Sequence, residues 1–268
     1  MDRLLTLKLD AIGCEAEAWL NGVPLARAHA ARPRALVPIH EYTLAGANRL
    51  ELVVFPPPAT AKPEDLPPPL KLKSDGLMSA TARILLPRMG NTADESSSRS
   101  LAEVLWAPAT GESFEPPLSL SQELQLPVSF PRWRWLEAPI VEPTPALQAQ
   151  AAALVNQLGQ EIAAGDFGNF FNATRLRSEE LAVAYQRPQE AVTAQLRDRL
   201  QALAAARAVW ASAEAEALVL RRLAGGRLLE ILAADGQPAL RTEPDETGAV
   251  HAFPLRVAAV EGRLYVLR

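Results

Sequence analysis

Residues 15–27 read EAEAWLNGVPLAR. Polar and apolar side chains alternate as far as Leu20, with the period of two that is typical of a half-buried β-strand. The dipeptide Asn21-Gly22 follows, and it readily adopts the positive φ angles that a two-residue hairpin turn requires. The stretch therefore predicts a β-hairpin, with one strand over residues 15–20 and its return over residues 23–27.

Further strand patterns surround this hairpin in the first half of the chain. They cover residues 4–9, 35–39, 49–55, 80–86 and 118–130. Proline triplets at residues 56–58 and 67–69 cannot continue a strand ladder, so we expect a surface loop there and a second loop over residues 90–100. Short strands separated by turns predict an antiparallel β-sandwich over residues 1–143, with proline-rich loops.

The pattern changes near Pro143, where we place the domain boundary. Thr144-Pro145 is typical of a helix start, and apolar residues then recur at spacings of three and four as far as Ile162. Two more helical patterns and four strand patterns follow, over residues 178–185, 188–207, 217–223, 227–233, 249–260 and 263–267. We therefore predict an α+β roll over residues 144–268, with helices within 145–207 and antiparallel strands within 216–268. The fold class of the whole chain is α+β.

Composition narrows the class of partner. The chain has 268 residues, with 27 Lys and Arg against 31 Asp and Glu and a net charge of -4. No overall positive field would attract nucleic acid or an anionic membrane. The single cysteine, Cys14, cannot form an intrachain disulfide. No apolar run approaches the roughly 20 residues that span a bilayer, and no signal-peptide pattern opens the sequence. We expect a cytoplasmic protein that neither binds nucleic acid nor inserts into a membrane.

Residue types that carry catalysis or bind metals are sparse and scattered. His29, His40 and His251 lie far apart, outside any helical metal-binding pair. The sequence contains neither a nucleophile-elbow motif nor a phosphate-binding loop. Two carboxylate pairs, Asp94-Glu95 and Asp245-Glu246, fall in predicted loops, which favours solvated charge over glycosidase chemistry. The sequence thus predicts no catalytic residue, no metal ligand and no cofactor.

Residues 132–135 read RWRW and are the candidate binding residues. With a period of two, Trp133 and Trp135 would share one face, and Arg132 and Arg134 the other. Exposed indoles would form an aromatic platform for a sugar ring or a partner protein, since Trp and Arg carry much of the binding energy of interfaces. Buried indoles would instead form a seam between the two domains.

Part of the first half resembles a known sugar-binding module. Residues 16–25 (AEAWLNGVPL), then His40-Glu41-Tyr42 and residues 46–52 (GANRLEL), resemble the jelly-roll module attached to family 2 glycoside hydrolases. In that module one strand ends in Leu-Asn-Gly, and a later Gly-any-Asn-any-Leu opens another. The resemblance implies a sandwich and, as one hypothesis, carbohydrate binding. Because the shared features are mostly turn chemistry, the topology can be shared without the ligand.

Part of the second half resembles the nuclear transport factor 2-like or cystatin-like roll. The similar stretches are residues 158–171 (LGQEIAAGDFGNFF) and 260–267 (VEGRLYVL). Enzymes of that family use an Asp or a His inside a cone, which would make Asp166 and His251 the candidates here, although Asp166 also fits a turn. Phe167, Phe170 and Phe171 are predicted core anchors, with a ligand pocket as the alternative.

Two well-patterned cores without clustered catalytic residues favour a non-enzymatic protein-binding protein. One version of this hypothesis is an immunity or adaptor protein of a bacterial toxin or type VI-like secretion system. Its partner would then be a toxin or a secretion component, and a homodimer is left open. A carbohydrate-binding module and a small-molecule enzyme of the nuclear transport factor 2-like type are the alternatives.

Overall fold

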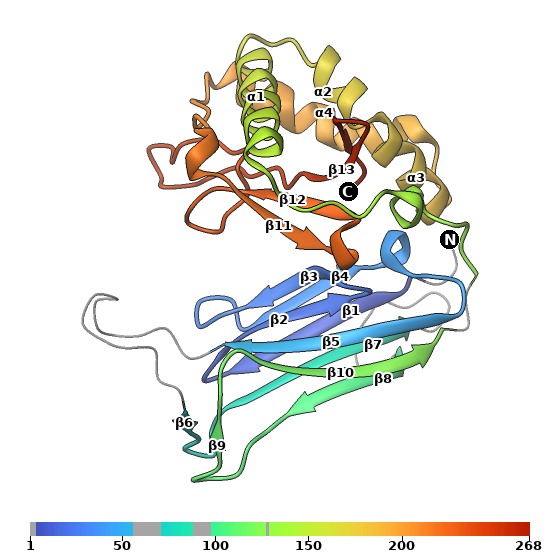
Figure 1. Cartoon of the computed structure of the whole chain (residues 1–268), viewed down its shortest axis with the longest axis vertical. Coiled ribbons are helices and arrows are strands. Elements are labelled where there is room, and N and C mark those ends of the chain that lie inside the picture. Colours follow the sequence, from blue (N-terminus) through green and yellow to red (C-terminus); the bar gives the residue numbers. More distant parts are fainter. Residues whose placement is uncertain (1–3, 56–70, 88–97, 127–128) are drawn as a thin grey trace. The chain divides into compact units, whose positions relative to one another are not determined.

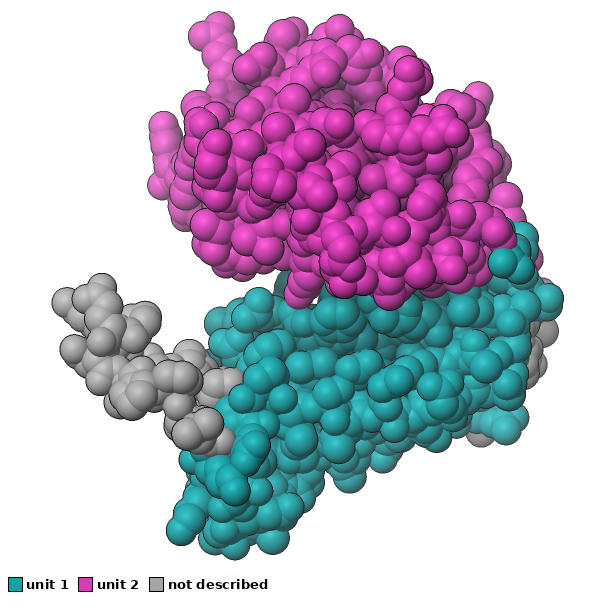
Figure 2. Space-filling model, viewed as in Figure 1, with its two compact units in different colours: residues 1–132 teal, residues 133–268 magenta. Residues whose placement is uncertain are grey.

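The computed structural model describes residues 4–55, 71–87, 98–126 and 129–268 (Figure 1). The chain divides into two compact units, residues 1–132 and 133–268, which Figure 2 shows in different colours. Residues 133–143, which the sequence pattern assigns to the first domain, belong with the second unit. The loop predicted around the proline triplets, and residues 90–97 of the second predicted loop, lie outside the described residues.

Two four-stranded antiparallel sheets build unit 1. The first has the order β4-β1-β7-β8, with β4 at Arg34–Pro38, β1 at Thr6–Ile12, β7 at Ser79–Pro87 and β8 at Ser98–Trp106. The second has the order β10-β5-β2-β3, with β10 at Leu118–Gln125, β5 at Ala47–Phe55, β2 at Glu15–Leu20 and β3 at Val23–Ala28. A 3-10 turn, η1, spans His40–Tyr42, and a short ribbon pairs β6 (Leu72–Lys73) with β9 (Ser113–Phe114). The predicted N-terminal antiparallel sandwich is confirmed.

The hairpin of β2 and β3 forms as the sequence predicts. Asn21 and Gly22 have φ angles of 53° and 76°, which are the positive values that a tight hairpin turn needs at both central residues. Leu20 pairs with Val23 directly beside the turn. The alternate residue Ala18 is buried together with Leu20, so the period-two pattern decides which face of the strand enters the core.

Two strands differ from the expectation. The sequence pattern does not predict β8, whose first residues continue a serine-rich stretch, but it pairs along almost all of β7. The alternation of residues 118–130 gives a strand only as far as Gln125, and residues 127–128 lie outside the described part. Strand β10 lies at the edge of its sheet, and its leucines Leu118, Leu120 and Leu124 are only half-buried.

Unit 2 consists of helices followed by an antiparallel sheet, which confirms the α+β class. Its helical elements are η3 (Arg134–Glu137), α1 (Pro145–Ala163), α2 (Gly168–Ala173), α3 (Arg175–Tyr185), α4 (Gln189–Ala205), η4 (Ala215–Ala217) and η5 (Ala224–Gly226). Its strands are β11 (Val219–Leu223), β12 (Leu228–Leu232), β13 (Arg256–Val260) and β14 (Arg263–Val266), and they pair in chain order.

Helix α1 lies across one face of this sheet (Figure 1). It begins as predicted, because the Thr144 hydroxyl accepts a hydrogen bond from the N–H of Leu147 at 3.2 Å. Val155 and Leu158 on its inner face share one hydrophobic cluster with Leu229 of β12 and Val257 of β13. The helical apolar spacing therefore places this face of α1 on the sheet.

The strand predicted over residues 249–260 forms only at its end. Residues 256–260 are β13, whereas residues 252–255 follow the sheet as an irregular segment. The N–H of Phe253 donates to the carbonyl oxygen of Leu240 at 2.8 Å, which fixes this segment. Helix α2, also unpredicted, brings Phe170 to within 6.3 Å of Phe253, measured between ring centroids.

Candidate functional site

Trp133 and Trp135 are buried, with 1% and 2% of their surfaces exposed, whereas Arg132 and Arg134 are exposed. The indoles and the guanidinium groups separate as the alternation predicts, although η3 is a 3-10 turn and not a strand. The Arg268 guanidinium lies 5.6 Å from the Trp133 ring centroid, within cation–π range. Neither indole offers an open face to a sugar ring, so of the four candidate residues only the arginines reach solvent.

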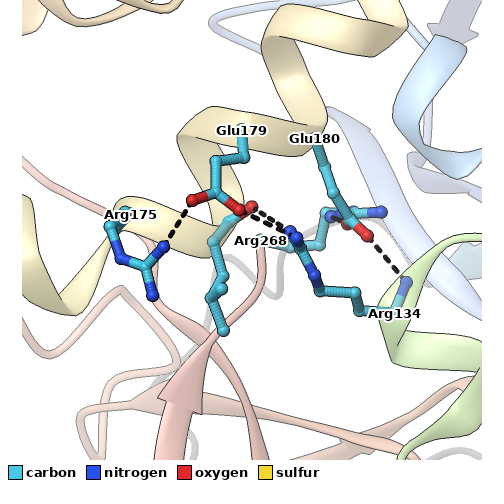
Figure 3. A network of polar contacts seen from close by, with 6 residues as sticks. Arg134, Arg175, Glu179, Glu180 and Arg268 are labelled. Carbon is cyan, nitrogen blue, oxygen red and sulfur yellow. Dashed lines mark hydrogen bonds and ion pairs between the residues drawn. The ribbon is translucent and has the colours of Figure 1, made fainter.

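Arg134 belongs to an ion-pair network with α3 (Figure 3). Its Nη2 lies 2.8 Å from Oε2 of Glu179, which also pairs with Arg175 at 2.5 Å. The backbone N–H of Arg134 donates to Oε1 of Glu180 at 2.7 Å, and Oε2 of Glu180 accepts from the buried Arg268. These contacts attach residues 133–137 to α3, which is a structural role.

The asparagines of the sugar-module resemblance brace turns. Asn21 donates from Nδ2 to the carbonyl oxygen of Tyr42 at 2.8 Å and to Oδ1 of Asn48 at 2.9 Å. Oδ1 of Asn48 also accepts from the N–H of Leu44, while its Nδ2 donates to the carbonyl oxygens of Leu44 and Gly46. The turn chemistry thus explains these motif residues without a ligand.

The histidines and the carboxylate candidates are dispersed. His40 is buried, and its Nε2 accepts a hydrogen bond from the N–H of Leu5 at 2.8 Å. Asp166 is an exposed turn residue that accepts from the N–H of Gly168. His251 is half-buried, and its backbone N–H donates to the Thr242 hydroxyl. Among the described residues, neither Asp166 nor His251 lines either of the two hollows described below.

The two carboxylate pairs give no catalytic dyad within the described residues. Asp245 is exposed, and hydrogen bonds from the Thr247 hydroxyl and from the backbone N–H groups of Ala249 and Thr247 lower its pKa below the ordinary value. This geometry is that of a turn residue. The other pair, Asp94-Glu95, lies outside the described residues.

Across residues 4–55, 71–87, 98–126 and 129–268, no cluster of three or more His, Cys, Asp or Glu side chains could hold a metal ion. Within the same ranges, no helix has both the length and the apolar character needed to cross a bilayer.

Unit 2 contains an apolar groove, which we call the Phe253 groove. Helices α2, α3 and α4 form one side of it, and residues 252–255 with β14 form the other. Its volume is about 550 Å³, within the range of about 300–1,000 Å³ that is usual for binding pockets. The apolar lining includes Phe170, Leu181, Val192, Leu196, Phe253 and Leu255.

Arginines border this groove and a second hollow on the other flank of α4. The guanidinium of Arg199 lies 4.3 Å from the Phe253 ring centroid and donates to the carbonyl oxygen of Ala252 at 3.4 Å. Arg197 stacks in the same way on Phe171, also at 4.3 Å. That contact lies in the second hollow, which has a volume of about 580 Å³ and which Arg175 and Thr193 also line. Stacking holds both guanidinium groups at defined positions.

The charges around the Phe253 groove have one sign. Arg177 and Arg199 line it, and no carboxylate is found among its described lining residues. The wider hairpin of α3 and α4, residues 175–207, carries six arginines against four acidic residues, in a chain whose net charge is -4. The groove therefore combines an apolar floor with a locally positive border.

Sequence reasoning identified only part of this site. For Phe170 and Phe171 it offered a ligand pocket as the alternative to a role in the core. In the structure, Phe170 lines the Phe253 groove and Phe171 lines the second hollow. Sequence reasoning did not identify Arg199 or Phe253, which are 54 residues apart along the chain. Helical spacing could place Val192, Leu196 and Arg199 near one another on α4, but no local signal shows which distant segment meets them.

Comparisons of this chain with protein families, with curated proteins and with solved structures found no match.

Proposed function

We propose that this chain is a non-enzymatic protein-binding protein, and that the Phe253 groove is a surface at which it holds its partner. The observation that carries the proposal is an apolar groove bordered by Arg177 and by Arg199, which stacks on Phe253. Aromatic and arginine side chains together are typical of the residues that dominate binding energy in protein interfaces.

The exposure of the groove favours a segment of a protein over an enclosed small molecule. Gln195, Arg199 and Pro254 are exposed, and Leu181, Val192 and Leu196 are half-buried. Sites for small molecules usually enclose most of the ligand surface. A small molecule in this groove would keep one side exposed to solvent. A segment of a partner protein would not, because the rest of that protein would cover the rim.

An immunity or adaptor role in a bacterial toxin or type VI-like secretion system is the specific form of this proposal. It predicts a single stable partner, a toxin or secretion component, and genes for such a component next to the gene for this chain. A homodimer would give the groove a second copy of the chain as its occupant, and light scattering of the purified protein distinguishes this case.

Site-specific photocrosslinking in the source cells tests the proposal. The photoreactive amino acid benzoylphenylalanine replaces Gln195 at the rim of the groove or, as a control, the exposed Gln201 on the same helix, which lines neither hollow. We expect one protein adduct of defined mass at position 195 and not at position 201. Equal adducts at both positions, or none at either, would contradict a partner at this surface.

A further inference from the structure

We infer that the segment held in the Phe253 groove is acidic as well as apolar, with an Asp or Glu side chain on the guanidinium of Arg199. The inference rests on the proposed function, since it names the chemistry of the partner at that site. Its basis is the position of Arg199, the single sign of the lining charge and the partial exposure of the apolar floor.

The contacts of Arg199 leave its guanidinium in a position to bind an anion. Its guanidinium stacks on Phe253 at 4.3 Å, and one of its N–H groups donates to the carbonyl oxygen of Ala252. A guanidinium has five N–H donors in a planar fork that matches a carboxylate. In the described part of the chain no carboxylate forms an ion pair with Arg199. A carboxylate from outside the chain would therefore complete its hydrogen bonding.

The neighbouring acidic residues do not neutralise this position. Asp198 and Glu190 are exposed on α4, yet neither lines the Phe253 groove. Glu179 is paired with Arg134 and Arg175, away from the groove. The charged side chains in the described lining of the groove are therefore arginines, which favour acidic ligands over basic ones.

The second hollow places a further stacked arginine on the other flank of α4, although Glu190 also lines that hollow. Arg197 stacks on Phe171 there and, like Arg199, forms no ion pair within the described residues. The two arginines are two positions apart on the helix and project to opposite flanks, because successive residues turn by about 100°. A partner segment that crosses α4 would meet apolar side chains in the groove and a guanidinium on each flank.

A displayed library of random peptides, selected on the intact chain, tests the chemistry without knowledge of the natural partner. Counter-selection uses Gln195→Glu, which adds a carboxylate at the exposed rim and should leave the fold intact. We expect selected peptides to be enriched in Asp, Glu and large apolar residues and depleted in Lys and Arg. Two results would overturn the inference. One is that the peptides that bind the unchanged chain but not Gln195→Glu are neutral or basic. The other is that no peptide with this behaviour is recovered.

Affinity measurements with one selected peptide then assign the charge to Arg199. Arg199→Gln should weaken binding by about tenfold to a hundredfold, as for the loss of a charge-assisted hydrogen-bonded pair. The control Arg187→Gln removes an exposed arginine of the same hairpin that lines neither hollow, and it should change affinity less than about threefold. Equal losses in the two variants would show a diffuse charge effect and overturn the inference.

Two outcomes separate this inference from the proposed function. A crosslinked partner at position 195 that still binds Arg199→Gln with full affinity would retain the protein-binding function and reject the acidic segment. Saturable binding of dodecanoate, dependent on Arg199 and without any peptide binding, would reject the acidic protein segment in favour of a small anionic amphiphile.

Discussion

At the scale of single residues, Asn48 connects three stretches of unit 1 through one buried amide. Its Oδ1 accepts from Asn21 and from the N–H of Leu44, and its Nδ2 donates to the carbonyl oxygens of Leu44 and Gly46. Removing the amide leaves partly buried donors and acceptors without these partners, which lowers stability.

Asn48→Ala should therefore destabilise unit 1 by about 1–3 kcal/mol. Urea denaturation followed by circular dichroism measures the change in the free energy of unfolding. Glu123→Ala on the exposed edge strand β10 is the control, and it should change that free energy by less than about 0.5 kcal/mol. Equal effects of the two substitutions would show that the hydrogen bonds of the Asn48 amide make no specific contribution to the free energy of unfolding.

Cys14 is a buried thiol, and burial raises its pKa to about 11. The thiolate is the reactive form, so at pH 8 the folded protein should react with Ellman's reagent far more slowly than the urea-unfolded protein does. Because the folded pKa is raised, the contribution of this group to stability is complete below the unfolded pKa of about 8.5. It is lost as the pH rises through 11. Equal reaction rates in the folded and unfolded protein would contradict this burial.

At the scale of elements, α3 places two neighbouring glutamates in different environments. Glu179 lies in solvent contact between Arg134 and Arg175, whereas Glu180 is buried and pairs with the buried Arg268 (Figure 3). An exposed ion pair contributes little, because water solvates the separated charges nearly as well. A buried arginine that loses its carboxylate has no such compensation.

Glu180→Ala should destabilise unit 2 by about 3–5 kcal/mol, and Glu179→Ala by about 0–1 kcal/mol. The two sites are adjacent on one helix, so helix propensity is the same in both variants. The free energies of unfolding from urea titrations provide the comparison. A larger loss for Glu179→Ala would reverse the assignment of the buried pair.

At the scale of the whole molecule, the division of the chain has a structural basis in residues 133–143. The guanidinium of Arg227 donates to the carbonyl oxygen of Ala138 at 2.6 Å. The N–H of Val141 donates to the carbonyl oxygen of Gly226 at 3.0 Å. Arg222 pairs with Glu142 at 2.7 Å. Together with the Arg134 network, these contacts tie the segment to unit 2.

A fragment of residues 133–268 should consequently be more stable than one of residues 144–268. The shorter fragment loses the hydrogen bond from the N–H of Arg134 to the buried Glu180, which by itself costs about 1–3 kcal/mol. Thermal unfolding of both fragments by circular dichroism makes the comparison. Equal midpoints of thermal unfolding would place the boundary of the folded unit near Pro143, where the sequence pattern changes.

Much of the fold could be predicted because its signals are local. The hairpin follows from the turn chemistry of Asn21 and Gly22, and the start of α1 follows from the cap at Thr144. Strand β8 and the irregular segment 252–255 could not be predicted, because pairing with β7 and with Leu240 decides their conformation. Local propensity gives way to such tertiary pairing.

The sequence by itself determined the α+β class, the hairpin of β2 and β3, the start of α1 and the dearth of catalytic motifs. These depend on periodicity, on turn dihedrals and on residue types, which are properties of short segments. Only the tertiary structure decided that Trp133 and Trp135 are buried, that Glu180 and not Glu179 is the buried acid, and that Arg199 meets Phe253. Burial and contact depend on which distant segments pack together, and that information is distributed over the whole chain.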